Sequence, residues 1–550
     1  MQDKGFKYFI NYLRQQIGKA AEEAYNQLVE SSGRNVDFLN TLTDIFRGIA
    51  TALEPNEAFI TEAFGPGAFP DFAAGLHGEC DTHGSQLLRR FMQQRKLPQL
   101  MRQTLAASGP KRLAKDEAAP EGASSVDPRQ VEESLGELLL LCQRSEEYSQ
   151  YMLAMLARGA GSSTTQAASP TAPAGSRASA TRTPAVAQRE NAFRAGAFCT
   201  AVRELVSCYT HLEQYYLEHN VSKAARIDEW TAEVLTTSVV DDTFFILQKC
   251  GGRALATGNL QCVCAVLGHL NSLLTSTLRA SLEHKWKGAA LKLVQSLPGG
   301  AGAAQEAGTV TSASMEAAEA AATLNNAGMS ATYVGKLLQE LEAGANSVFP
   351  APSDRERVKS VLADLAKTAS DFRVIASKGL ELLANGILPR LRPIMDKVPG
   401  YELTEAEYAA KEAQTTWVHE LLGALVGCLR WLQPILTPDN YDALVAAALE
   451  KVVERLEAIV AGRRFNQLGG LQLDRDVRLA VATLGEVTQR TVRDKWARLS
   501  QMATILSLET CEELLDYWAG GTWRLSPAQA RQVLAQRVDF DEASIVALDL

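Results

Sequence analysis

The side chains that most resemble a metal-binding group lie close together near residue 80. His77 and His83 flank Cys80 and Asp81, and all four are residue types that bind metal ions. No second group of such residues stands nearby in the sequence, so we interpret the cluster as a charged helix start that follows a loop. The spacing favours a structural role over a metal site.

The sequence lacks the patterns on which common catalytic sites depend. No Gly-Lys-Ser or Gly-Lys-Thr string is present to hold a phosphate, and no Gly-x-Ser-x-Gly turn occurs. The seven histidines never form His-x-x-x-His; His211 and His219 lie eight residues apart beside tyrosines, where we expect a core-edge role. We therefore predict no catalytic residues, no cofactor and no metal ion, and we expect the chain not to be an enzyme.

Composition indicates a helical protein that binds no nucleic acid. The chain has 550 residues, too many for one core, and roughly three to five domains are expected from its length. Alanine and leucine are abundant and β-branched runs are short, which favours helices over sheets. The net charge of −9 repels a phosphate backbone.

The cysteines are odd in number and irregularly spaced, so we expect reduced core residues in a cytosolic protein and not a disulfide framework. The nine are Cys80, Cys142, Cys199, Cys208, Cys250, Cys262, Cys264, Cys428 and Cys511. The first residues carry charges throughout, so no signal peptide is expected. The uncharged stretch 254–278 is long enough to cross a bilayer, but its many polar residues favour a buried bundle helix.

The pattern predicts an all-α fold of tandem irregular helical bundles that form an elongated rod, with long disordered loops. The predicted segments are a bundle at 1–158, a disordered linker at 159–190, a bundle at 191–297, a linker at 298–317, a bundle at 318–464 and a compact helical domain at 465–550.

The strongest helical stripe follows the first linker and uses steps of four and three. It consists of Phe198, Val202, Leu205, Tyr209, Leu212 and Tyr216. The two tyrosines suggest a core edge where their hydroxyl groups reach water. In the segment from 318 to about 460, six prolines are expected to separate long helices. They are Pro350, Pro352, Pro389, Pro393, Pro399 and Pro434.

The last segment contains several helix-start signals. The paired glycines Gly469 and Gly470 permit a tight turn or a close backbone approach, and Asp474 suits the N-cap of the next helix. Two capping boxes are predicted, at residues 510–513 and at residues 526–529, the second with Pro527 at the first helical position.

Long strings in this segment resemble the conserved oligomeric Golgi complex subunit 4 family. They are FNQLGGLQLDRDVR (465–478), RDKWARLSQMATILSLE (493–509), LLDYW (514–518) and TWRLSPAQARQVLAQRVDF (522–540). Further strings upstream resemble the same family: FGPG (64–67), FCTAVRELVSCYTHLEQYY (198–216) and VVDDTFFILQKCGGRAL (239–255). The resemblance covers most of the chain and is patchier between residues 290 and 410.

The resemblance implies a structural subunit of a multisubunit tether, peripheral on the cytosolic face of Golgi membranes. It further implies a role in retrograde vesicle transport and in retention of glycosylation enzymes, with the other tether subunits and SNARE machinery as partners. The family's N-terminal portion, with its coiled-coil assembly segment, is expected to be missing from this sequence. Gln529 stands where the resemblance implies Glu, so its interaction with a nearby Arg such as Arg498 is expected to be weaker here.

Residues 461–500 contain eight basic and four acidic side chains, which stands out in an acidic protein. The basic residues are Arg463, Arg464, Arg475, Arg478, Arg490, Arg493, Lys495 and Arg498. They form a candidate partner-binding patch for an acidic partner or an anionic membrane surface. Internal pairing of these side chains is the simpler interpretation.

Three hypotheses remain open from the sequence. A tethering scaffold predicts binding through extended helical surfaces. A membrane-surface helical module predicts binding of lipid through basic helix faces. An all-helical enzyme predicts a concave site with perturbed acids or histidines.

Overall fold

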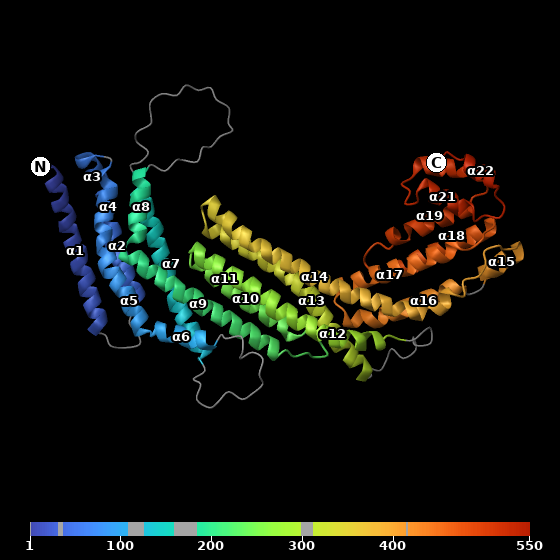
Figure 1. The fold of residues 1–550 in the computed structure, drawn as a ribbon, viewed down its shortest axis with the longest axis horizontal. Helices are drawn as coiled ribbons and strands as arrows, with labels where there is room; N and C mark the ends of the chain where they lie inside the picture. Colours follow the sequence, from blue (N-terminus) through green and yellow to red (C-terminus); the bar gives the residue numbers. More distant parts are fainter. Residues whose placement is uncertain are drawn as a thin grey trace, which may run out of the picture. The chain divides into compact units, whose positions relative to one another are not determined.

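The computed structural model describes residues 2–30, 37–65, 67–107, 126–158, 184–298, 312–413 and 416–549. Within these ranges the regular structure is helical, and the only β-type contacts are isolated bridges at Tyr401, Phe465 and Arg537 (Figure 1). The predicted all-α class is therefore confirmed. The predicted disordered linkers fall mostly on residues outside the described ranges.

The chain divides into two compact units, each made of several chain segments. Unit 1 comprises residues 1–223, 243–273 and 337–365, and unit 2 comprises residues 224–242, 274–336 and 366–550. The sequence-based division into four helical segments stays a prediction.

The first part of the chain forms α1 to α9 and one π-helical turn, η1. Their bounds are α1 Gln2–Glu30, α2 Phe38–Leu53, α3 Glu57–Phe64, α4 Ala68–Glu79, η1 Cys80–Gly84, α5 Ser85–Gln94, α6 Leu97–Ala107, α7 Pro128–Ala157, α8 Pro184–Ala195 and α9 Ala197–Arg226. Within unit 1, α1 packs on α2 and α4, and α7 packs on α2, α4 and α8.

The remaining helices run from α10 to α22. Their bounds are α10 Ser238–Ala256, α11 Leu260–Leu273, η2 Leu274–Leu278, α12 Arg279–Gln295, α13 Ser312–Val348, α14 Pro352–Met395, α15 Glu405–Ala413, α16 Trp417–Leu432, η4 Gln433–Ile435, α17 Pro438–Ala461, α18 Gln467–Gly485, α19 Arg493–Ser507, α20 Glu513–Gly520, α21 Pro527–Leu534 and α22 Glu542–Ala547. In unit 2, α18 and α19 lie side by side, α16 contacts α18, and α17 and α21 contact α19 (Figure 1).

The predicted stripe on α9 is buried along its whole length, which confirms the helical spacing. Phe198, Leu205, Tyr209 and Leu212 have no exposed surface. The expectation that both tyrosines stand at a core edge is wrong for Tyr209, because other helices of unit 1 cover this face completely. Tyr216 is 9% exposed and its hydroxyl donates to Glu132 at 3.4 Å.

Two helix starts and the effect of two prolines differ from the sequence expectation. Helix α8 begins at Pro184 and α13 begins at Ser312, inside the segments assigned to linkers. In each case good helix formers follow the first residue. Pro184 lies at the first position of α8, where a backbone N–H would have no partner within the helix, so its absence does not destabilise the helix. Pro389 and Pro393 lie within α14 and do not end it. Each proline removes one backbone hydrogen bond of the helix. The free energy gained by burying Leu383, Ile387 and Leu391 on this part of α14 is larger than this loss.

All nine cysteines are free thiols, and seven of them are buried. Burial raises the pKa of every one of these thiols above its ordinary value, so each behaves as a small apolar side chain. Across the described residues, we find no helix with the length and apolar character that a bilayer crossing demands.

Candidate functional site

The histidine and cysteine cluster near residue 80 lies in the middle of a continuous helix, so its interpretation as a helix start is wrong. Cys80, Asp81 and His83 belong to the π-helical turn η1 between α4 and α5. His77 Nδ1 lies 3.0 Å from the Tyr148 hydroxyl, and Asp81 accepts from the backbone N–H of Phe198 at 2.8 Å. In the described residues, no three His, Cys, Asp or Glu side chains are arranged to hold a metal ion.

Helix α18, which lies within the basic segment, starts earlier than predicted. The N-cap is Asn466, whose side chain accepts from Gly469 N–H at 3.0 Å, and not Asp474. The same amide group donates to Leu403 O at 2.7 Å and accepts from Leu403 N–H at 3.1 Å. Asn466 therefore starts the helix and also fixes the segment before α15, a distant contact that local spacing does not reveal.

The paired glycines permit a close backbone approach, which is one of the two alternatives that the sequence left open. A Cβ atom on Gly469 would lie 1.7 Å from Tyr401 O, and one on Gly470 would lie 1.9 Å from Leu506 O. Both glycines have ordinary helical backbone, since neither shows a positive φ. They are required because α18 presses directly on the backbone at residue 401 and on the end of α19.

A buried arginine completes this contact, and sequence reasoning missed it. Arg537 is 4% exposed, and its Nη1 donates to the carbonyl oxygens of Leu506 and Leu508 at 2.7 Å each. Its Nε and Nη2 donate to both carboxylate oxygens of Asp539 at 2.8 Å. Arg537 thereby neutralises its charge and satisfies two carbonyls at the end of α19. The spacing Arg-x-Asp is too common to have identified it.

Most of the eight predicted patch residues have partners within unit 2. Arg463 donates to Val398 O at 3.0 Å. Four others form ion pairs: Arg478 with Asp474 at 2.7 Å, Arg490 with Asp442 at 3.7 Å, Lys495 with Glu450 at 2.5 Å, and Arg498 with Glu457 at 2.9 Å. Arg464, Arg475 and Arg493 are exposed. The patch as a binding surface stays a prediction.

The structure gathers three of these arginines on one groove, which we call the α18–α19 groove. On α18 it is lined by Asp474, Val477, Arg478, Val481, Ala482 and Gly485. On α19 it is lined by Arg493, Ala497, Ser500 and Thr504. Residues 488–492, which join the helices, close one end, and Arg490 and Val492 lie there. Steps of three and four place each set on one helix face.

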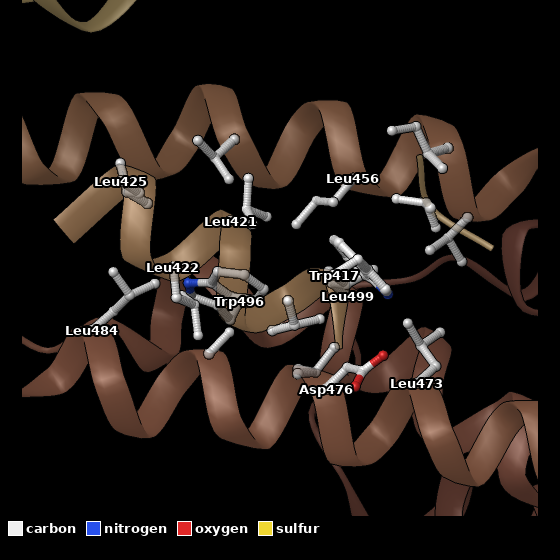
Figure 2. A pocket seen from close by; sticks show the side chains of 17 residues that line it. Trp417, Leu421, Leu422, Leu425, Leu456, Leu473, Asp476, Leu484, Trp496 and Leu499 are labelled. Carbon is white, nitrogen blue, oxygen red and sulfur yellow. The ribbon is translucent and has the colours of Figure 1, made fainter. Parts of the chain in front are cut away.

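The opposite side of α18 faces a small internal cavity (Figure 2). Trp417, Trp496 and many aliphatic side chains line it, and Asp476 is its only ionisable residue. Its volume of about 20 Å³ accommodates roughly one water molecule, whereas ligand pockets are usually about 300 Å³ or larger. This cavity is a packing defect of the core and not a substrate site.

Asp476 makes the stability of unit 2 depend on pH. It is 5% exposed, and burial raises its pKa to about 6, although hydrogen bonds from Gln472 and Tyr401 act in the opposite direction. Because the pKa of Asp476 is higher in the folded chain, its protonated form stabilises the fold. This contribution is fully present below pH 3.8 and is lost as the pH rises through about 6.

We expect Asp476→Asn to remove this pH dependence. As the pH rises from 4 to 7.5, the free energy of unfolding of the wild-type chain should fall by about 2–3 kcal/mol more than that of the variant. This difference follows from the rise of about two units in the pKa of Asp476 on folding. Thermal unfolding measured across this pH range for both proteins tests the difference. Parallel pH profiles of the two midpoints would contradict it. The matched variant Asp494→Asn, at an exposed site on α19, should leave the profile unchanged.

The two predicted capping boxes have different outcomes. The box at 526–529 is confirmed: Gln529 N–H donates to Ser526 Oγ at 3.3 Å, and Ser526 N–H donates to Gln529 Oε1 at 3.0 Å. The box at 510–513 is wrong, because α20 begins at Glu513 with no side-chain cap. The Glu513 carboxylate instead accepts from Glu509 N–H at 3.2 Å.

Arg498 lies beside the confirmed capping box, as expected. Its Nη1 donates to Gln529 Oε1 at 3.5 Å, and its stronger partner is Glu457. We expect Gln529→Glu to raise stability by about 0.5–1 kcal/mol, because a carboxylate there faces both Arg498 and the N-terminus of α21. A thermal midpoint higher by about 1–3 °C would be the result, and it should shrink in high salt. Gln532→Glu on the same helix is the control and should give no gain.

Two family models match most of the chain. Residues 1–286 match the family described as "COG4 transport protein, middle alpha-helical bundle". Residues 320–532 match "Conserved oligomeric Golgi complex subunit 4, C-terminal". Among solved structures, M-Sec aligns with 98% of this chain and 78% of its own length, at 13% identity and a TM-score of 0.48.

Two curated relatives share the full length of the chain. Conserved oligomeric Golgi complex subunit 4 of Arabidopsis thaliana is 38% identical over 564 residues, which cover 100% of this chain and 71% of the relative. The Homo sapiens protein of the same name is 30% identical over 578 residues, with coverage of 100% and 71%. The chain therefore belongs to the conserved oligomeric Golgi complex subunit 4 family.

Proposed function

We propose that the chain is a structural subunit of a multisubunit Golgi tethering complex and acts by binding other proteins. It would serve retrograde vesicle transport within the Golgi and the retention of glycosylation enzymes. Two successive family regions, residues 1–286 and 320–532, cover most of the chain and support this proposal most directly. The helical bundles of both units offer long helix faces of the kind that subunits of an assembly use.

The geometry supports binding over catalysis. The cavity beside Asp476 has room for about one water molecule, so its perturbed carboxyl group has no space for a substrate. The cluster around His77 and Cys80, which also holds catalytic residue types, is engaged in packing with Tyr148 and Phe198. We therefore infer that the chain is not an enzyme.

The partners in this proposal are the other subunits of the complex and SNARE machinery. The chain would associate peripherally with the cytosolic face of Golgi membranes. The exposed arginines of unit 2, including Arg464 and Arg493, supply positive charge that suits acidic partners at such a site.

Affinity purification of the chain from cell extract, followed by identification of the co-purifying proteins, tests the proposal. Recovery of the other tether subunits in fixed ratio is expected. Recovery of none of them, from cells in which all are present, would refute it.

The contribution of the basic residues to this binding is tested by charge reversal. Arg464→Glu is preferable to Arg463→Glu, because Arg463 also donates a hydrogen bond to the Val398 carbonyl within the fold. Arg524→Glu, at an exposed arginine of the same unit, is the matched control.

A further inference from the structure

The α18–α19 groove is the largest uncovered concave surface among the cavities described for unit 2. Its volume is about 980 Å³. The two lining faces run for about three helical turns each, from residue 474 to 485 and from 493 to 504. On their other sides the two helices are covered by α16, α17 and α21. The groove is thus the side of the helix pair that its own unit leaves open.

We propose that the α18–α19 groove binds an acidic amphipathic helix of a partner protein. The inference rests on the proposed function, since it names the chemical class of one partner of such a subunit. It assigns three residues of the predicted patch, Arg478, Arg490 and Arg493, to the rim of the binding site.

The floor of the groove suits a helix. Small side chains line it at Ala482, Gly485, Ala497 and Ser500. Small residues let a third helix approach closely, and the partly exposed Val481 beside them supplies apolar surface for its apolar stripe. A helix of three turns is about 17 Å long, which matches the length of the two lining faces, and the groove would enclose one side of it.

The rim selects for acidic side chains. The side chains of Arg478 and Arg490 are 80% and 57% exposed, and Arg493 is exposed as well. The single acidic residue in the lining, Asp474, is already paired with Arg478 at 2.7 Å. Arg490 keeps a long contact of 3.7 Å to Asp442, so its guanidinium retains donors for a further carboxylate. Three arginines around an apolar floor complement a helix with Glu or Asp on its flanks.

A lipid bilayer fits the same surface less well. Membrane-surface helices insert large side chains such as Trp, Phe or Leu, and none lines the groove. The small side chains lie in a concave floor, where a flat headgroup layer makes little contact. The arginines alone would give only a salt-sensitive attraction to anionic lipids.

Photo-crosslinking in the full chain tests the inference. A benzoylphenylalanine residue replaces Ala482 or, in a second protein, Ala497, and the control protein carries it at the exposed Val538. Each protein is expressed in cells that contain the other tether subunits, irradiated and purified, and the crosslinked segments are identified by mass spectrometry. Circular dichroism verifies that each variant is folded.

The expected result is an adduct from the groove positions, and not from Val538, with one amphipathic helical segment that carries acidic flanks. Arg490→Glu with Arg493→Glu should lower its yield about tenfold or more, whereas Arg524→Glu should not change it. An adduct with lipid, with a second copy of this chain or with a segment lacking acidic flanks would overturn the inference. So would the absence of any adduct. Co-purification of the tether subunits is scored in the same samples, so the proposed function stands or fails separately.

Discussion

Replacing Gly470 with alanine should unfold the C-terminal helices of unit 2. A Cβ atom at this position would lie 1.9 Å from Leu506 O and 2.3 Å from Leu506 C, far inside any real contact distance. Both atoms belong to the backbone, so no side-chain rotation relieves the clash. We expect a loss of more than about 3 kcal/mol, at the upper end of the range for overpacked sites.

The cost is high because the clashing carbonyl is held from its other side. Leu506 O accepts from Arg537 Nη1 at 2.7 Å, and the same guanidinium is fixed by Asp539 and by the ring of Phe540. Movement of Leu506 away from an alanine at 470 breaks or compresses this bond. Arg537 would then keep a buried charge with fewer acceptors, which adds to the penalty.

Gly485→Ala is the matched control on the same helix. A Cβ atom there has no neighbour within 4 Å, so alanine should be neutral or stabilising by up to about 1 kcal/mol. Hydrogen exchange across residues 465–549 measures both variants and separates local from global unfolding. Equal protection in the two variants would contradict the close-approach explanation.

Local patterns in the sequence predicted much of the fold. Helical spacing identified the buried face of α9, and the serine, proline and glutamine at 526–529 identified the start of α21, because these signals act within a few residues. The need for glycine at 469 and 470 was also visible. The atoms that require it, Tyr401 O and Leu506 O, lie tens of residues away and could not be named in advance.

The errors came from distant contacts that override local preference. Asp474 is a good N-cap by type, yet Asn466 takes the role because it also bonds to Leu403 in the segment before α15. Pro389 and Pro393 end no helix because their helix is buried on its apolar face. The basic residues of 461–500 were predicted as one patch, but which of them share a groove depends on how α18 and α19 pack.

The buried polar pairs were equally invisible, since their members lie far apart in sequence. In unit 2, Asn325 donates to Leu235 O at 2.8 Å and to Ile435 O at 2.9 Å, and it accepts from Thr437 N–H at 3.1 Å. One asparagine thus connects the two segments that immediately precede α10 and α17. Nothing in its own neighbourhood distinguishes it from other asparagines of an alanine-rich helix.

The second large effect is expected in unit 1, where Arg253→Met should destabilise the protein by about 3–5 kcal/mol. Glu213 has no exposed surface, and its Oε1 accepts from Arg253 Nη2 at 2.7 Å. Arg253 also stacks on the Tyr216 ring, with its guanidinium carbon 4.8 Å from the ring centre. Loss of the guanidinium leaves a carboxylate in the core of unit 1 without a counter-charge.

A second substitution distinguishes the unpaired charge from lost packing. Adding Glu213→Leu to Arg253→Met removes the stranded carboxylate, so the double variant should recover most of the stability that the single variant loses. Arg144→Met, which breaks the exposed pair with Glu147, is the control and should cost less than about 1 kcal/mol. Thermal unfolding of the wild type, both single variants and the double variant measures the coupling, with Arg144→Met measured beside them. A double variant as unstable as the sum of both single changes would show that packing around Tyr216, and not the buried charge, dominates this part of the core.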